Sequence, residues 1–344
     1  MSIKEAIQEV IKGNSLSEDQ MAGVFEQIMS GGATDAQIGS FLTALRLKGE
    51  TVEEITGAAG IMRKKATKLK VKTSVNINEE TVIDTCGTGG SGTNTFNVST
   101  ISAFVVAGCG VKVAKHGNRS ISSQCGSADV LKELGVNIDL SPEKVADCVK
   151  KIGIGFLYAP LYHGAMKYAI GPRREIGIRT IFNVLGPLTN PAGADSQIIG
   201  VYDESLTEVI ARVLKNLGTR RAFVVHGLDG LDEITVTSGT KVSELRDNKI
   251  QTYCIKPEDF GIPRSTLNDI RGKDAKVNAE IALNVLSGEK GPKRDIVLLN
   301  SAAALTAASK TDDIQAGIKI AEESIDSQQA INKLNQLKKV SNEL

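Results

Sequence analysis

The first 70 residues place apolar side chains with the period of an α-helix. Apolar residues recur at positions i, i+3, i+4, i+7 and i+8 in residues 21–29, and residues 38–45 repeat the first four of these positions, so each segment offers one apolar face to a partner. Ser17, Thr34 and Thr51 are each followed three residues later by Gln or Glu, which is the capping-box pattern of a helix start. The pattern predicts a small helical domain.

After the polar segment 72–81, short apolar runs alternate with helical segments, which is typical of a largely parallel sheet covered by helices. The strands are expected at residues 82–84, 111–114, 154–158, 197–202, 222–226 and 295–299. The helices are expected at residues 102–108, 127–134, 142–152, 206–217, 278–286 and 302–308. Residues 234–255 are expected to form antiparallel strands joined by Ser-Gly and Asp-Asn turns.

Composition narrows the class of protein. A chain of 344 residues with 41% hydrophobic and 24% charged residues fits a globular protein of two domains. The N-terminus lacks a signal peptide and no long apolar run occurs, which favours a cytoplasmic protein without a membrane partner. A net charge of +1 gives no general attraction to nucleic acid. The five scattered cysteines indicate neither a disulfide framework nor a zinc site.

The most distinctive stretch is DTCGTGGSGTNTFNVST, residues 84–100. Its glycines allow main-chain N–H groups to approach a bound phosphate. The spacing Gly-x-Gly-x-x-Gly also fits a dinucleotide site, but the acidic residue expected about 20 positions later is missing. Lys112, Lys115 and Arg119 stand there instead and suit a second phosphate. A tight strand-to-helix turn capped by Ser or Thr is the alternative.

Two further blocks follow predicted strands. KHGNRSISS, residues 115–123, supplies basic, amide and hydroxyl groups, and HGLDGLDEIT places Asp232 beside Glu233. Loops at the carboxyl ends of parallel strands share one sheet edge, where ligands of open α/β sheets bind. Adjacent carboxylates suit Mg²⁺, which also takes ligands from substrate phosphates. A solvated basic turn and an acidic surface turn are the respective alternatives.

Together these blocks resemble the anthranilate phosphoribosyltransferases. The ordered set comprises GTGG, NTFNVST, KHGNRSISS, LYHGAMK, GPRREIGIRTIFNVLGPLTNPAG and HGLDGLDE, and it covers almost the whole chain. The resemblance implies an α/β fold of the nucleoside phosphorylase and phosphoribosyltransferase type. A small all-helical domain, residues 1–74 and 165–192, is expected to be hinged to a larger α/β domain with a mostly parallel central sheet, residues 75–164 and 193–344.

The resemblance further implies transfer of the phosphoribosyl group from 5-phosphoribosyl 1-diphosphate to the amino group of anthranilate, with Mg²⁺, by a homodimer. It assigns phosphoribosyl diphosphate to Gly87, Gly90, Ser91, Thr95, Asn97, Val98, Ser99, Thr100, Lys115, His116, Gly117, Asn118, Arg119, Ser120, Ile121, Ser122, Ser123 and Ser127. It assigns anthranilate to Gly87, Asn118, His163 and Arg173, and the metal to Ser99, Asp232 and Glu233. No acid or base is identified; Lys115, Asn118 and Arg173 are expected to position the transition state.

Two positions depart from the family pattern. Ser91 stands where the glycine loop usually has Asp, which bears on metal handling, and Gly164 stands where Pro is common.

Two alternative functions would each be expected to leave a different mark on the sequence. A pyrimidine nucleoside phosphorylase normally carries an additional C-terminal domain. A non-catalytic, nucleic-acid-binding relative is expected to have a basic face, whereas 41 Lys and Arg here balance 40 Asp and Glu.

Overall fold

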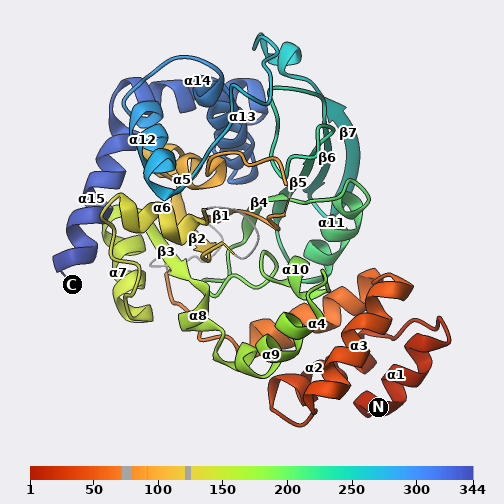
Figure 1. Ribbon diagram of the computed structural model, residues 1–344. Coiled ribbons are helices and arrows are strands. Elements are labelled where there is room, and N and C mark those ends of the chain that lie inside the picture. Colours follow the sequence, from red (N-terminus) through yellow and green to blue (C-terminus); the bar gives the residue numbers. More distant parts are fainter. Residues whose placement is uncertain (72–79, 91, 121–124, 344) are drawn as a thin grey trace.

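A computed structural model describes residues 1–71, 80–90, 92–120 and 125–343 (Figure 1). The N-terminal helices lie at one end of the molecule together with α9 (Lys167–Ile176) and α10 (Phe182–Leu185). The sheet and the C-terminal helices form the larger remainder. Within the described ranges, no helix has the length and apolar character needed to cross a membrane.

The four N-terminal helices begin where the capping boxes predict. They are α1 (Ile3–Ile11), α2 (Glu18–Met29), α3 (Asp35–Lys48) and α4 (Val52–Lys65). At Ser17, Thr34 and Thr51 the hydroxyl accepts a bond from the amide three residues on, and the side chain of that residue bonds back to the cap amide. A fourth box, Ser2 with Glu5, starts α1. Reciprocal bonds of this kind satisfy amides that have no partner within the helix.

The central sheet has seven strands in the order β3-β2-β1-β4-β5-β6-β7. Their bounds are β1 (Val82–Gly87), β2 (Lys112–Gly117), β3 (Ile154–Tyr158), β4 (Ser196–Gly200), β5 (Arg221–Gly227), β6 (Thr240–Arg246) and β7 (Lys249–Ile255). The first five are parallel, and β5, β6 and β7 pair antiparallel. Asp247 and Asn248, with φ of 50° and 60°, form the expected turn between β6 and β7, whereas residues 234–239 are not a strand.

The predicted helices of the α/β part are present. Between and after the strands lie α5 (Val98–Gly108), α6 (Ser127–Glu133), α7 (Pro142–Ile152), α8 (Ala159–Tyr162), α11 (Leu206–Asn216), α12 (Ala275–Leu286), α13 (Pro292–Ala307), α14 (Ile314–Asp326) and α15 (Gln329–Glu343). The strand predicted at residues 295–299 is wrong, because this apolar run belongs to α13, which is buried along almost its whole length. A short apolar run has the same appearance in a buried helix and in a buried strand.

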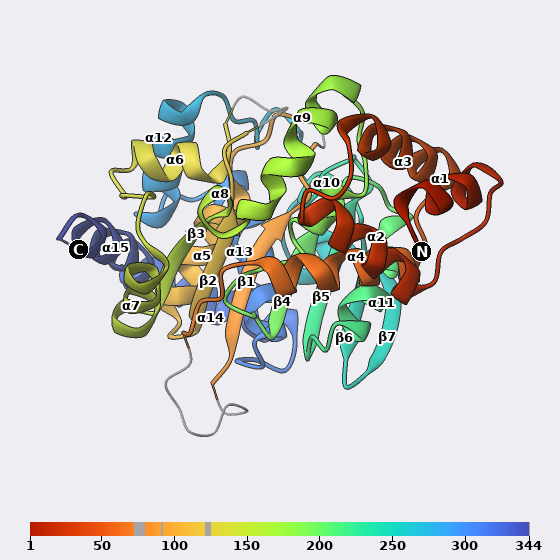
Figure 2. The same ribbon diagram turned by 90° about the horizontal axis from the view of Figure 1, so that it is seen from below.

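Two apolar cores pack on opposite faces of the sheet. Ile198 and Phe223 belong to the core shared with α5 and α13, whereas the neighbouring Ile199 and Val224 belong to the core of the N-terminal helices. Side chains alternate between the faces of a strand, so β4 and β5 contribute to both cores. Seen from below, α9 runs beside the N-terminal helices (Figure 2), contacting α2 and α3. The exact domain bounds stay a prediction.

Candidate active site

The glycine loop after β1 contacts the acidic loop after β5. The amide of Gly89 donates to Asp232 Oδ2 at 2.9 Å. A Cβ on Gly87 would lie 2.7 Å from the same oxygen, so a larger residue there would displace the Asp232 carboxylate. Gly89 and Gly90 have φ of +66° and +81°, the left-handed region that glycine tolerates. The two predicted blocks therefore meet at the carboxyl edge of the sheet.

The start of α5 contacts the second carboxylate of the acidic pair. The Ser99 amide donates to Glu233 Oε1 at 3.2 Å. Both Asp232 and Glu233 are half-buried, and burial together with the negative charge of Asp232 raises the pKa of Glu233 to about 8. A divalent cation placed beside the two carboxylates would supply positive charge that stabilises both in the ionised form.

The donor set fits Mg²⁺ rather than a metal that needs a cage of protein ligands. Ser99, Asp232 and Glu233 lie together, and the described residues contain no group of three or more His, Cys, Asp or Glu that could hold a metal. Mg²⁺ commonly takes one or two carboxylates and completes its octahedral shell with water and substrate phosphate oxygens. Those remaining positions are therefore open to a phosphorylated substrate.

Lys115 and His116 lie at the end of strand β2 and not in the loop that follows it. Lys115 is only 3% exposed; its ammonium donates to the Thr85 carbonyl and to Ser99 Oγ at 3.3 Å, and burial lowers its pKa. Its side chain thus supports Ser99 from within the protein. Asp84, fully buried, accepts from the His116 amide at 3.1 Å; the sequence analysis missed it, although an acidic residue inside an apolar strand is a signal.

The loop after β2 is closed at its base. Ser127 Oγ donates to the Asn118 carbonyl at 3.3 Å, and Asp129 Oδ2 accepts from the Ser120 amide at 3.2 Å. A Cβ on Gly117 would lie 2.2 Å from Ser127 Oγ, so a larger residue there would displace the Ser127 side chain at the start of α6. Four of the predicted residues, Ser91, Ile121, Ser122 and Ser123, lie outside the described residues.

Other predicted residues of the phosphoribosyl site are engaged elsewhere. Arg119 Nε donates to the hydroxyl of Tyr158 at 3.1 Å. Val98 and Thr100 are buried, and their amides donate to carbonyls of Phe96 and Asn97 within the first turn of α5. Both side chains are buried within the protein, and Thr100 Oγ1 has no hydrogen-bond partner among the residues that the structure describes.

On the acceptor side, His163 contacts His116. Their Nε2 atoms are 3.2 Å apart. Burial and the second imidazole lower the pKa of His116 to about 3, and burial lowers the pKa of His163 to about 4. Both rings are therefore neutral at physiological pH, so that one donates its proton to the lone pair of the other.

Arg173 on α9 is half-buried, and its guanidinium carbon lies 4.9 Å from the centre of the Phe182 ring. Burial lowers its pKa, and no carboxylate in the described parts of the chain pairs with it. A half-buried guanidinium without an acidic partner is a suitable site for the carboxylate of a ligand.

Arg179 makes a second link between the α9 segment and the anion loops. Its Nη2 donates to the Gly90 carbonyl, and its guanidinium carbon lies 4.4 Å from the centre of the Tyr202 ring. The segment that carries Arg173 is thus fixed to the crevice on one side through His163 and on the other through Arg179. Sequence reasoning missed Arg179, because nothing local distinguishes it from the neighbouring arginines.

Comparisons with known proteins agree with this geometry. The family described as "Glycosyl transferase family, a/b domain" matches residues 79–331, and its helical bundle domain matches residues 4–66. The anthranilate phosphoribosyltransferase of Geotalea uraniireducens is 58% identical, covering 99% of this chain and 100% of the relative. That of Geobacter sulfurreducens is 57% identical with the same coverage.

Solved structures of the same enzyme share the fold. The crystal structure from Thermus thermophilus has a TM-score of 0.91 at 38% identity, covering 98% of this chain and 99% of that one. A Saccharomyces cerevisiae structure in complex with PRPP and Mg has a TM-score of 0.89 at 28% identity, covering 99% and 98%. Given relatives more than half identical over nearly the full length, the chain belongs to the anthranilate phosphoribosyltransferase family.

Proposed function

We propose that this chain transfers the phosphoribosyl group of 5-phosphoribosyl 1-diphosphate to the amino group of anthranilate, giving N-(5-phosphoribosyl)anthranilate and diphosphate in tryptophan biosynthesis. Family membership supports this reaction. The structural observation that carries it is the meeting of the glycine loop, the start of α5 and the Asp232–Glu233 pair at one sheet edge. This arrangement gathers anion-binding amides and a cation site in one place.

In the proposed complex, the diphosphate lies against the glycine loop and the start of α5, and the phosphoribosyl part lies against residues 115–123 and Ser127. Ser99, Asp232 and Glu233 would hold Mg²⁺, a use that the yeast complex with PRPP and Mg supports. When bound, the metal supplies positive charge to the departing diphosphate. The buried Lys115 ammonium donates a hydrogen bond to the Ser99 hydroxyl and so holds it in position.

Anthranilate would bind on the α9 side of the crevice. The guanidinium of Arg173 can pair with the ring carboxylate in fork geometry, and neutral His163 would line the acceptor site. The amine of anthranilate is an uncharged aniline, so it needs no strong base before it attacks. Catalysis then depends mainly on positioning the amine at the anomeric carbon and on stabilising the leaving diphosphate.

The proposal is tested by the fluorescence of anthranilate on addition of phosphoribosyl diphosphate and Mg²⁺. We expect the fluorescence to fall while diphosphate is released in equal amount. Phosphate-dependent release of the base from a pyrimidine nucleoside, without loss of anthranilate fluorescence, would instead identify a nucleoside phosphorylase. Retention of DNA without either turnover would favour the nucleic-acid-binding alternative.

The family resemblance also leads us to propose a homodimer formed through the helical domain, in the cytoplasm. Ile11 at the end of α1 and Leu47 in α3 are 70% and 83% exposed, and α1 packs against α3. Large exposed apolar side chains on these helices are candidates for an interface when they form one contiguous patch.

A further inference from the structure

The segment before α12 packs directly on the glycine loop, although about 175 residues separate them in sequence. Thr95 and Arg271 form an antiparallel bridge, and the Gly272 amide donates to the Asn94 carbonyl at 2.8 Å. A Cβ on Gly272 would lie 2.6 Å from the Phe96 nitrogen. The close fit fixes the first turn of α12 relative to the start of α5.

Asn278 on α12 sits at the centre of this contact and is only 2% exposed. Its Nδ2 donates to Asn97 Oδ1 at 3.0 Å, and its Oδ1 accepts from the Lys273 amide at 2.8 Å. Asn97 in turn donates from Nδ2 to the Cys125 carbonyl at 3.3 Å. Asn97 therefore connects the start of α5 to the loop after β2, and the buried amide of Asn278 holds the Asn97 side chain in place from α12.

The conformation of Asn97 agrees with such a connection. Asn97 occupies the N-cap position of α5, where asparagine commonly accepts from an amide of the first turn. Here its side chain makes no capping bond; both of its polar ends are used in the bridge between Asn278 and Cys125. The Asn97 side chain therefore links the start of α5 to the loop after β2 and does not cap the helix.

We infer that Asn278 is a positioning residue that, by fixing the Asn97 side chain, holds the two anion-binding loops at the spacing required by one phosphoribosyl diphosphate molecule. This inference rests on the proposed function. The ligand carries phosphate groups at both ends of the ribose, so the two loops must be in register to bind both at once. Small displacements of positioned groups cost large factors in rate and binding, and a buried network loses its full effect when one member is removed.

The first test is Asn278→Ala, with Asn284→Ala, an exposed residue of the same helix, as the control. We expect the KM for phosphoribosyl diphosphate to rise about tenfold in Asn278→Ala, the size typical of one lost buried hydrogen bond. The KM for anthranilate should change less than twofold, and the control should match the wild type. Equal changes in both KM values would indicate general loosening and overturn the inference.

A second variant guards against misfolding of the first. Asn278→Asp keeps the size of the side chain and the acceptor for the Lys273 amide, and as a carboxylate it cannot donate to Asn97. Because a buried carboxylate lowers stability, KM is measured at a temperature at which circular dichroism shows the variant to be folded, and there we expect the same selective rise. A KM for phosphoribosyl diphosphate equal to that of the wild type would contradict the role of the bridge.

The bridge is tested further by combining Asn278→Ala with Asn97→Ala. If both residues act through one connection, the double variant should be no worse than the more affected single variant. Multiplying effects would show that they act independently and would overturn the inference. Calorimetric titration with phosphoribosyl diphosphate and Mg²⁺ compares the dissociation constants of the same variants without requiring turnover. If the wild type binds this ligand but does not consume anthranilate, the proposed function is contradicted, and the role of Asn278 is still tested by the binding data.

Discussion

At the scale of single residues, Arg173 differs from the other cations of its helix. Arg174 is exposed, whereas Arg173 is half-buried over Phe182 without an acidic partner among the described residues. A guanidinium in such a place is stabilised when a ligand brings a carboxylate. The sequence offered two adjacent arginines, and burial distinguishes between them.

We predict that Arg173→Ala raises the KM for anthranilate roughly 10- to 100-fold, since a charge-assisted hydrogen bond contributes about 1.5–3 kcal/mol. The KM for phosphoribosyl diphosphate should change little. Steady-state kinetics from anthranilate fluorescence measure both. Arg173→Lys keeps the positive charge but not the paired N–H donors of the guanidinium, so its KM for anthranilate should fall between those of the wild type and Arg173→Ala. Arg174→Ala is the matched control, and an equal effect there would contradict the assignment.

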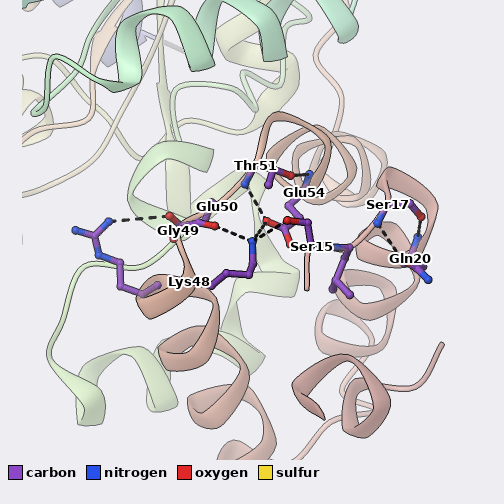
Figure 3. A network of polar contacts seen from close by, with 10 residues as sticks. Ser15, Ser17, Gln20, Lys48, Gly49, Glu50, Thr51 and Glu54 are labelled. Carbon is purple, nitrogen blue, oxygen red and sulfur yellow. Dashed lines mark hydrogen bonds and ion pairs between the residues drawn. The ribbon is translucent and has the colours of Figure 1, made fainter. Parts of the chain in front are cut away.

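At the scale of elements, the N-terminal helices are joined by a buried ion pair between α3 and α4 (Figure 3). Lys48 Nζ lies 2.9 Å from Glu54 Oε2, with side-chain exposures of 8% and 0%. Glu54 also accepts from the amides of Thr51 at 2.8 Å and Leu16 at 2.9 Å. The capping glutamate of α4 therefore also fixes the loop before α2 and the end of α3.

We predict that Glu54→Ala lowers the free energy of unfolding by about 3–5 kcal/mol, because it leaves the buried Lys48 ammonium without its counter-ion and removes the acceptor of two backbone amides. Chemical denaturation followed by circular dichroism measures the change. The adjacent exposed Glu53 provides the control, and Glu53→Ala should stay within about 0.5 kcal/mol of the wild type. Adding Lys48→Met to Glu54→Ala should recover part of the loss; no recovery would show that the charge is not the cause.

At the scale of the whole molecule, the pair of His116 and His163 joins the sheet to the segment that leads into α9. Both imidazoles have pKa values well below their ordinary value of 6.5 in the folded protein, about 3 and about 4, because they are buried. Below pH 6.5 the unfolded chain binds protons that the folded protein does not. Stability therefore falls as the pH falls through this range.

We predict that the two imidazoles together make the free energy of unfolding fall by about 2.7 kcal/mol per pH unit between about pH 6 and pH 4. His163→Gln removes one titrating group and can still donate to His116, so its slope should be smaller by about 1.4 kcal/mol per pH unit. Denaturation midpoints across this range measure both slopes. Parallel pH profiles for the two proteins would contradict the buried neutral pair.

Local features of the sequence determined much of this protein. Capping boxes at Ser17, Thr34 and Thr51 start helices as expected, since a cap depends on residues three positions apart. Five parallel strands lie where short apolar runs predict them, and the loops with glycine and with Asp232 meet at one edge. Alternating strands and helices predict that these loops lie at the same edge, because parallel strands end on the same side of a sheet.

Tertiary structure alone decided which of these residues are buried and which distant residues they contact. Residues 295–299 form part of α13 because the surrounding core covers the helix on nearly all sides and removes the periodic signal. Lys115 turns inward to Ser99, and Asn278 bonds to Asn97, which is far from it in sequence. Such contacts depend on how whole elements pack, which no local pattern of residue types records.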